Sequence, residues 1–146
     1  MYKSNRNRQL SLSDFNQPTG LKMNPENRWI KRAEMIPWAE IEEKYASLFP
    51  SRTGRPAKPP QVALGSLIIQ KQYDYSDREL VEQIRENPYY QFFIGLSGYQ
   101  DRAPYALSLL VEFRKRLTDD ILSEINEMIA KHNIMKEPVI IRSAFW

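Results

Sequence analysis

The sequence of 146 residues carries a net charge of +3 and no cysteine, which suits one compact domain, alone or with tails. The lack of cysteine excludes disulfides, thiolate metal sites and cysteine nucleophiles, and the single histidine, His132, excludes a His-rich metal site. No apolar run approaches a membrane span, and the polar N-terminus lacks the apolar stretch of a signal peptide, so we expect a cytoplasmic protein with no membrane partner and no cofactor.

Positive charge is unevenly spread along the chain. The first 60 residues carry 11 Lys and Arg against 6 Asp and Glu, whereas residues 61–100 carry 3 against 5. A second, local cluster of basic residues follows at 114–116. Such an asymmetry is typical of a nucleic-acid partner, and a solubilising surface explains it equally well.

Residues 1–24 are polar and predict an extended N-terminal arm, in which the alternating residues 9–13 could form a short strand. Asn24 followed by Pro25 predicts the first helix start. A second helix is expected from Pro37 to about Phe49. Its apolar residues recur at spacings of three and four, and so share a buried face: Trp38, Ile41, Tyr45 and Leu48.

Residues 50–60 hold four prolines and three basic residues with no acid, which predicts a solvated linker. The apolar stretch from Gln61 to Tyr73 predicts a central buried helix. A capping box, with Ser76 as the N-cap and Glu79 three residues later, opens the next helix. Asparagine and proline at 87–88 then open a short aromatic helix.

Pro104 predicts the start of a helix that runs to about Leu117, and Thr118 is the expected N-cap of a last helix over about residues 120–132. Residues 133–146 contain a proline and an apolar end without helical periodicity, which predicts an irregular tail. The sequence therefore predicts an all-α fold, with a multi-helix domain over residues 25–132 between the polar arm of residues 1–24 and the tail.

The segment from Gln61 to Leu117 has the layout of a helix-turn-helix-like, tri-helical core whose last helix is basic. A DNA-reading helix needs an apolar face against its neighbours and a basic face for phosphates and base edges. A basic helix end also suits a solvated C-terminus, where cations are favoured. The candidate DNA contacts on this helix are Arg114, Lys115 and Arg116.

The linker supplies a second set of candidate DNA contacts, Arg52, Arg55 and Lys58. An extended basic arm is thin enough to follow the DNA backbone or to enter an A·T-rich minor groove. An ordinary flexible linker explains the same residues as well.

Catalysis has little support from the pattern of acidic residues. Glu42 and Glu43 are adjacent, as are Asp119 and Asp120, so the members of each pair point in different directions on a helix. A two-metal nuclease site needs carboxylates that converge from separate elements, and the sequence specifies none. His132, near a helix end, fits a C-terminal cap better than a catalyst.

Several stretches together resemble the N-terminal domain of bacterial insertion-sequence transposases of the InsH-like, DDE type, and the resemblance covers about residues 1–132. The stretches are DFNQPTG at 14–20, NPENRWIKRAEMIPWAEIEEKYASLF at 24–49, TGRPAKPPQVALGSLIIQ at 53–70, YSDRELVEQIRENPYYQFFIGL at 75–96 and FRKRL at 113–117. In that family this region is regarded as the DNA-binding part, which recognises the element's terminal inverted repeats. A ribonuclease H-like domain with three metal-binding acids follows it.

Two features depart from that family. Its members tend to carry an aspartate soon after the proline of the last DNA-reading helix, where this sequence has Tyr105, Ala106 and Leu107. The family's metal-binding acids have no counterpart here, so we expect a truncated transposase fragment that is not itself an enzyme. We expect it to bind the double-stranded terminal inverted repeats, with a homodimer or a full-length transposase as possible protein partners.

Three other functions stay open from the sequence. The helical domain could be a protein-interaction or dimerisation module whose basic residues serve solvation. It could be a truncated inhibitor that occupies the inverted repeats of a full-length relative. A stand-alone nuclease is the third, and it would require metal-dependent cleavage of DNA by the chain itself.

Overall fold

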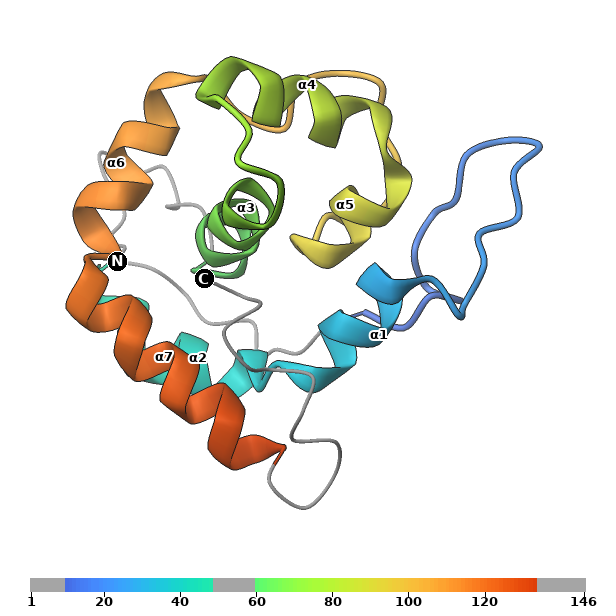
Figure 1. The fold of residues 1–146 in the computed structure, drawn as a ribbon. Coiled ribbons are helices and arrows are strands. Elements are labelled where there is room, and N and C mark those ends of the chain that lie inside the picture. Colours follow the sequence, from blue (N-terminus) through green and yellow to red (C-terminus); the bar gives the residue numbers. More distant parts are fainter. Residues whose placement is uncertain (1–9, 49–59, 134–146) are drawn as a thin grey trace.

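The computed structural model describes residues 10–48 and 60–133, and these fold into helices joined by short loops (Figure 1). In chain order the helices are α1 (Arg28–Met35), α2 (Trp38–Tyr45), α3 (Pro60–Tyr73), α4 (Asp77–Glu86), α5 (Pro88–Phe93), α6 (Ser108–Arg116) and α7 (Asp119–His132), with a 3-10 turn, Ala46–Leu48, after α2. Over these residues no strand forms, and the one isolated bridge joins Asn16 to Gly98. The all-α, multi-helix class is therefore confirmed.

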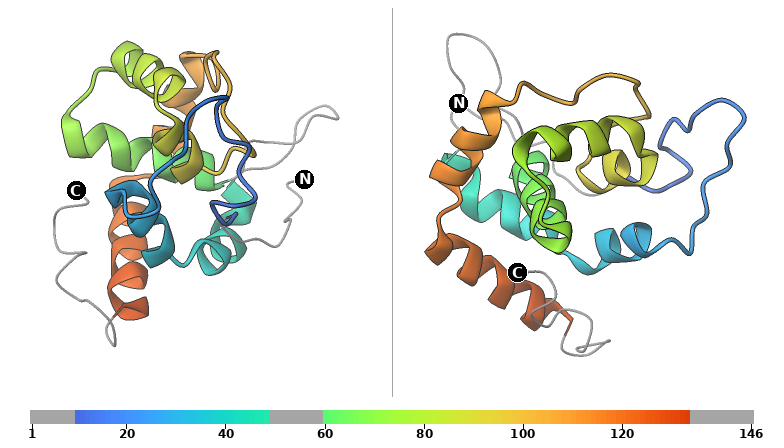
Figure 2. Two further views of the ribbon diagram at one scale, coloured as in Figure 1. Left: turned by 90° about the vertical axis from the view of Figure 1, so that its right-hand side faces the viewer. Right: turned by 45° about the horizontal axis from the view of Figure 1, so that its top comes forward.

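Helix α3 forms the centre of the core. Every residue from Val62 to Ile69 is buried, as expected for a helix that is apolar on all sides. Figure 1 views α3 nearly along its axis with the other helices around it, and Figure 2 shows the same surround from two other directions. Helices α2, α4 and α6 all contact α3 directly. The sequence prediction of a central buried helix here is confirmed.

A cluster of aromatic rings joins the N-terminal helices to α5. The ring centroids of Trp29 and Phe93 lie 4.8 Å apart, and those of Trp38 and Phe93 lie 5.6 Å apart, both in edge-to-face geometry. Tyr90 approaches Trp29 in the same way at 5.5 Å. Edge-to-face pairs contribute about 0.5–1.5 kcal/mol each beyond the area that they bury, so α1 and α2 are held firmly against α5.

Three helix starts follow their local capping signals. The side chain of Ser76 accepts a hydrogen bond from Glu79 N, that of Asn87 accepts from Tyr89 N and Tyr90 N, and that of Thr118 accepts from Ile121 N. These caps satisfy amides that have no partner inside the helix. The predicted N-caps of α4, α5 and α7 are thus confirmed.

The first helix begins three residues later than the sequence predicted. Asn24 closes a turn, because its backbone carbonyl accepts from Asn27 N at 3.0 Å and its side chain accepts from Glu26 N at 2.9 Å. Asn27 is the N-cap of α1, with its side chain accepting from Trp29 N. Two asparagines in a short segment offer the same local signal, and the burial of Trp29 and Ile30 selects the later start.

The polar N-terminal segment is not an extended arm over residues 10–24. Phe15 and Met23 are buried, and the Phe15 ring meets Phe92 edge-on at 5.6 Å. Asn16 exchanges backbone hydrogen bonds with the loop after α5, donating to Ser97 O at 3.0 Å and accepting from Tyr99 N at 2.8 Å. The strand considered for residues 9–13 is also wrong for residues 10–13, which run into a turn. Buried apolar side chains and backbone hydrogen bonds together hold this polar segment on the core.

Asn133 ties the end of α7 to the end of α1. Its side-chain amide donates to Met35 O at 2.7 Å and to Ile129 O at 2.8 Å. Asn133, the first residue of the predicted tail, is therefore part of the helical fold, and residues 134–146 lie outside the described part of the chain. Within residues 10–48 and 60–133, no helix combines the length and the apolarity that crossing a bilayer requires.

Candidate nucleic-acid interface

Helix α6, the predicted DNA-reading helix, rests on the core through one face and leaves the other in solvent. Leu110 and Phe113 are buried in it, and Leu117 follows as its buried C-cap. Ser108 and Lys115, on the other side of the helix, are exposed. Val111 lies between them with 46% of its surface exposed. The two-faced character that a groove-reading helix requires is present.

The start of α6 differs from the prediction, because the helix begins at Ser108 and not at Pro104. Pro104 and Tyr105 are buried, and the Tyr105 hydroxyl donates to Ser66 Oγ on α3 at 2.6 Å. Burial is the main reason that the pKa of Tyr105 rises to about 12. These tertiary contacts hold residues 104–107 out of the helix, and the N-cap Leu107 supplies no side-chain hydrogen bond.

Arg114 forms a two-pronged ion pair with Asp77 in the first turn of α4. Its Nη2 lies 2.8 Å from Asp77 Oδ2 and its Nη1 lies 3.0 Å from Asp77 Oδ1. Gln70 completes the cluster by donating to Asp77 Oδ1 at 2.8 Å. The hydrogen bonds from Arg114 lower the pKa of Asp77, and those to Asp77 raise the pKa of Arg114. Both side chains remain partly exposed, at 44% and 36%.

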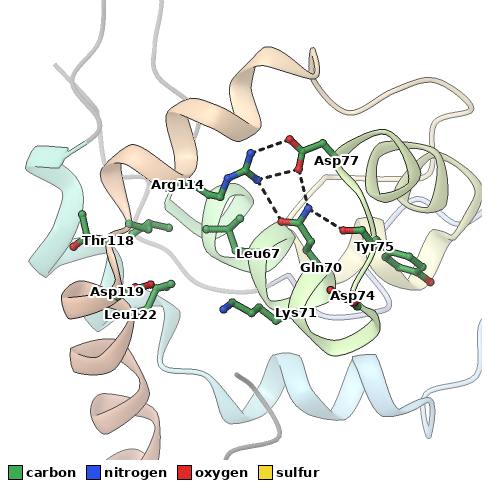
Figure 3. Close-up of a pocket in the computed structure, with 11 residues that line it drawn as sticks. Leu67, Gln70, Lys71, Asp74, Tyr75, Asp77, Arg114, Thr118, Asp119 and Leu122 are labelled. Carbon is green, nitrogen blue, oxygen red and sulfur yellow. Dashed lines mark hydrogen bonds and ion pairs between the residues drawn. The ribbon is translucent and has the colours of Figure 1, made fainter.

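A hollow of about 650 Å³ opens beside this cluster, between the end of α3 and the starts of α4 and α7. Figure 3 shows Arg114, Asp77 and Gln70 pointing toward one another along one side of it, with Lys71 below them. Leu67, Leu117 and Leu122 also line the hollow. The hollow thus combines an apolar floor with charged groups of both signs at its rim.

The other two basic residues of α6 differ in their surroundings. Arg116 lies 3.6 Å from Glu112, one turn earlier on the same helix. Lys115 is exposed and makes no ion pair within the described residues. The three predicted contacts are therefore adjacent, as expected, but two of them have carboxylate partners inside the protein.

The second predicted set, Arg52, Arg55 and Lys58, lies outside the described residues. Among the residues that the structure does describe, no three His, Asp or Glu side chains gather closely enough to hold a metal ion.

The outer surface of α4 is acidic. Arg85 is surrounded there by the carboxylates of Glu82 at 3.0 Å, Glu86 at 3.3 Å and Asp101 at 2.6 Å. Glu79, in the first turn of α4, is exposed as well. More negative than positive charge on this surface disfavours contact with phosphates, so α4 is a poor candidate for the DNA-facing side.

The sequence interpretation missed a pair of arginines on α1. The guanidinium carbon of Arg32 lies 4.8 Å from the Trp29 ring centroid, and that of Arg28 lies 5.9 Å from the Tyr73 ring centroid. Arg32 also donates to Gln72 on α3 at 3.4 Å. The available signal was the spacing of four residues between two arginines that flank a tryptophan, which places both cations on one side of a helix.

Comparison with known proteins identifies the family of the helical region. The family model described as Transposase domain (DUF772) matches residues 20–116, which includes α1 to α6. The chain belongs to the DUF772 transposase-domain family. A curated protein of Rhizobium meliloti, described as "Uncharacterized protein ORF8 in nfe locus", is 35% identical to this DUF772 member over 103 residues, or 70% of this chain. The chain spans about half, 49%, of the length of that relative. No solved structure matches this chain significantly.

Proposed function

We propose that this DUF772 family member binds double-stranded DNA as the DNA-recognising part of an insertion-sequence transposase, with the terminal inverted repeats of the element as its target. The observation that carries the proposal is α6, a helix seated on the core by Leu110 and Phe113 whose exposed side carries Ser108, Val111 and Lys115. The resemblance to InsH-like transposases supports the same role for residues 113–117.

Lys115 is the side chain of α6 that is best placed for a phosphate, since it is exposed and has no carboxylate partner among the described residues. Val111 and Ser108 lie one and two turns before it. A valine can contact a thymine methyl group, and a serine hydroxyl can bond to either a base edge or a phosphate. The basic linker residues Arg52, Arg55 and Lys58 would add contacts along the backbone.

Arg114 can also contact the DNA by exchanging the carboxylate of Asp77 for a phosphate. Its ion pair with Asp77 is substantially exposed, so solvent weakens the attraction between the two charges. A DNA phosphate offers the same two-pronged geometry to a guanidinium as a carboxylate does. The pair with Asp77 therefore holds Arg114 in an ordered position at little cost to its exchange for phosphate.

The test is a salt titration of binding to a duplex that carries the end sequence of the element, followed by fluorescence anisotropy. We expect an affinity that falls steeply with salt concentration and that is lost in the Arg114→Ala/Lys115→Ala double variant. Lys131→Ala, at the far end of α7, is the control and should bind as the unaltered chain does. Absence of binding at low salt would refute the proposal.

We further propose that this chain contributes binding and not strand cleavage, since the resemblance assigns cutting and transfer to a separate ribonuclease H-like domain. Incubation of the purified chain with supercoiled plasmid and Mg²⁺ or Mn²⁺ tests this directly. Metal-dependent nicking that survives further purification would overturn the proposal and favour a nuclease.

A further inference from the structure

Two arginines of α1 are held over a shared aromatic surface. Arg28 lies over the ring of Tyr73, and Arg32 lies over the ring of Trp29. The two rings are themselves neighbours, with centroids 6.3 Å apart. Because the arginines are four residues apart on one helix, their guanidinium groups project from the same side.

The rings beneath these arginines are fixed by the core. Trp29 is 3% exposed and meets Phe93 edge-on at 4.8 Å. Tyr73 packs at 5.4 Å against Tyr75. A guanidinium stacked on a fixed ring keeps its N–H groups available at its edge, and it has less freedom to lose when it binds a ligand.

The charge around Arg28 differs from that around Arg85 and Arg114. Arg85 and Arg114 lie within ion-pair distance of carboxylates, whereas Arg28 has no such partner within residues 10–48 and 60–133. Burial lowers the pKa of Arg32, and the nearby positive charge of Arg28 lowers it further. Two like charges on one surface attract an anion more strongly than either does alone.

The last turn of α3 connects this surface to α6. Gln70 accepts a hydrogen bond from Arg114 at 3.5 Å on the α6 side, and Gln72 accepts one from Arg32 at 3.4 Å on the α1 side. Lys71 lies between these two residues in the chain, and it is exposed at the rim of the hollow (Figure 3). One helix end thus separates the two basic regions. The two basic regions are therefore about one helix width apart, and a helix with its side chains is about 10–12 Å wide. This separation is similar to the width of the B-DNA major groove, about 12 Å.

We propose that Arg28 and Arg32 form a second phosphate-binding surface, which grips the backbone of the same duplex that α6 contacts. This inference rests on the proposed function, since it requires that the chain binds DNA. Paired guanidinium groups suit phosphate oxygens because each offers two parallel N–H donors. The contact carries no sequence information, and it sets the orientation of the protein on the duplex.

The experiment measures the affinity for a short duplex of mixed sequence between about 50 and 200 mM salt, using the full chain. The plot of log affinity against log salt has a negative slope, and each lost phosphate contact makes that slope less steep by about 0.9. We expect Arg28→Gln/Arg32→Gln to make the slope less steep by about 1.8, and Arg28→Gln alone to make it less steep by about 0.9. The charge-matched control is Lys44→Gln/Lys131→Gln, on α2 and α7, which should keep the original slope.

The outcomes separate this inference from the proposed function. If the unaltered chain does not bind the duplex at low salt, the proposed function fails first. If it binds but both arginine variants keep its slope, the second surface is refuted while the proposed function stands. An equal loss of slope in the lysine control would also refute the inference, because the effect would then be one of net charge. The exposed Arg28→Gln variant keeps the test valid even if replacement of the half-buried Arg32 unfolds the chain.

Discussion

The hydrogen bond between Tyr105 and Ser66 fixes the loop that leads into α6, and its removal is our most exact prediction. The Tyr105 hydroxyl donates to Ser66 Oγ at 2.6 Å, and the two residues are 6% and 0% exposed. The Tyr105 ring also meets Phe113 edge-on at 5.3 Å. The substitution Tyr105→Phe keeps the ring contact and removes only the hydroxyl.

The expected cost of Tyr105→Phe is about 1–3 kcal/mol in the free energy of unfolding, since Ser66 loses its donor in a place that water does not reach. For a chain of this size, each kcal/mol lowers the melting temperature by roughly 2–4 °C. Ser66→Ala should cost a similar amount because it leaves the tyrosine hydroxyl buried without its acceptor. The double variant Tyr105→Phe/Ser66→Ala removes both partners, and it should cost less than the sum of the single variants by about 1 kcal/mol.

Urea denaturation followed by far-UV circular dichroism measures these free energies. Tyr99→Phe is the control, since the half-buried Tyr99 hydroxyl makes no hydrogen bond within the described residues; its effect should stay within about 0.5 kcal/mol. A Tyr105→Phe variant as stable as the unaltered chain would show that this hydrogen bond does not stabilise the fold. A double variant that costs the full sum of the two single variants would show that the two hydroxyls do not interact.

Three further predictions concern α6 and the N-terminal segment. Asp77→Asn removes the carboxylate that competes with a phosphate for Arg114 and should strengthen duplex binding; an unchanged or lower affinity in the same titration would contradict the exchange of Asp77 for a phosphate. The pKa of Tyr105 rises from 10.0 to about 12 on folding, so the contribution of its neutral hydroxyl to stability is complete below pH 10.0 and is lost as the pH rises through about 12. Urea denaturation at several pH values should show that the free energy of unfolding falls less over this range in Tyr105→Phe than in the unaltered chain. Equal decreases in the two proteins would contradict this role of Tyr105. Gly98→Ala presses a Cβ against Asn16 and should lower the free energy of unfolding by about 1–3 kcal/mol; a neutral result in urea denaturation would mean that this contact does not hold residues 10–24.

The sequence predicted those features that depend on neighbouring residues. Ser76, Asn87 and Thr118 cap their helices as expected, because an N-cap bonds to amides only two or three positions ahead. The buried character of α3 was also readable, since a helix that is apolar on every side has no stable place at the surface.

The features that the sequence did not predict depend on contacts between distant residues. Asp77 and Arg114 are separated by 37 positions, and neither helix carries a local sign of the pair. Tyr105 fits the start of a helix by its position after Pro104, yet its hydroxyl reaches Ser66, 39 positions away. Phe15 and Met23 are single apolar residues in a polar stretch, so their burial follows from the shape of the core and not from periodicity.

The distribution of charge restricts how a duplex could approach this fold. The α4 surface around Arg85 presents the carboxylates of Glu82, Glu86 and Asp101, which would repel phosphates. The end of α3, in contrast, carries Lys71 at the rim of a hollow, with α6 on one side and the arginines of α1 on the other. A DNA ligand would therefore face the end of α3 and not the outer side of α4. In that orientation the arginines of α1 share the positive charge with α6, so the proposed DNA binding is compatible with the carboxylate partners of Arg114 and Arg116.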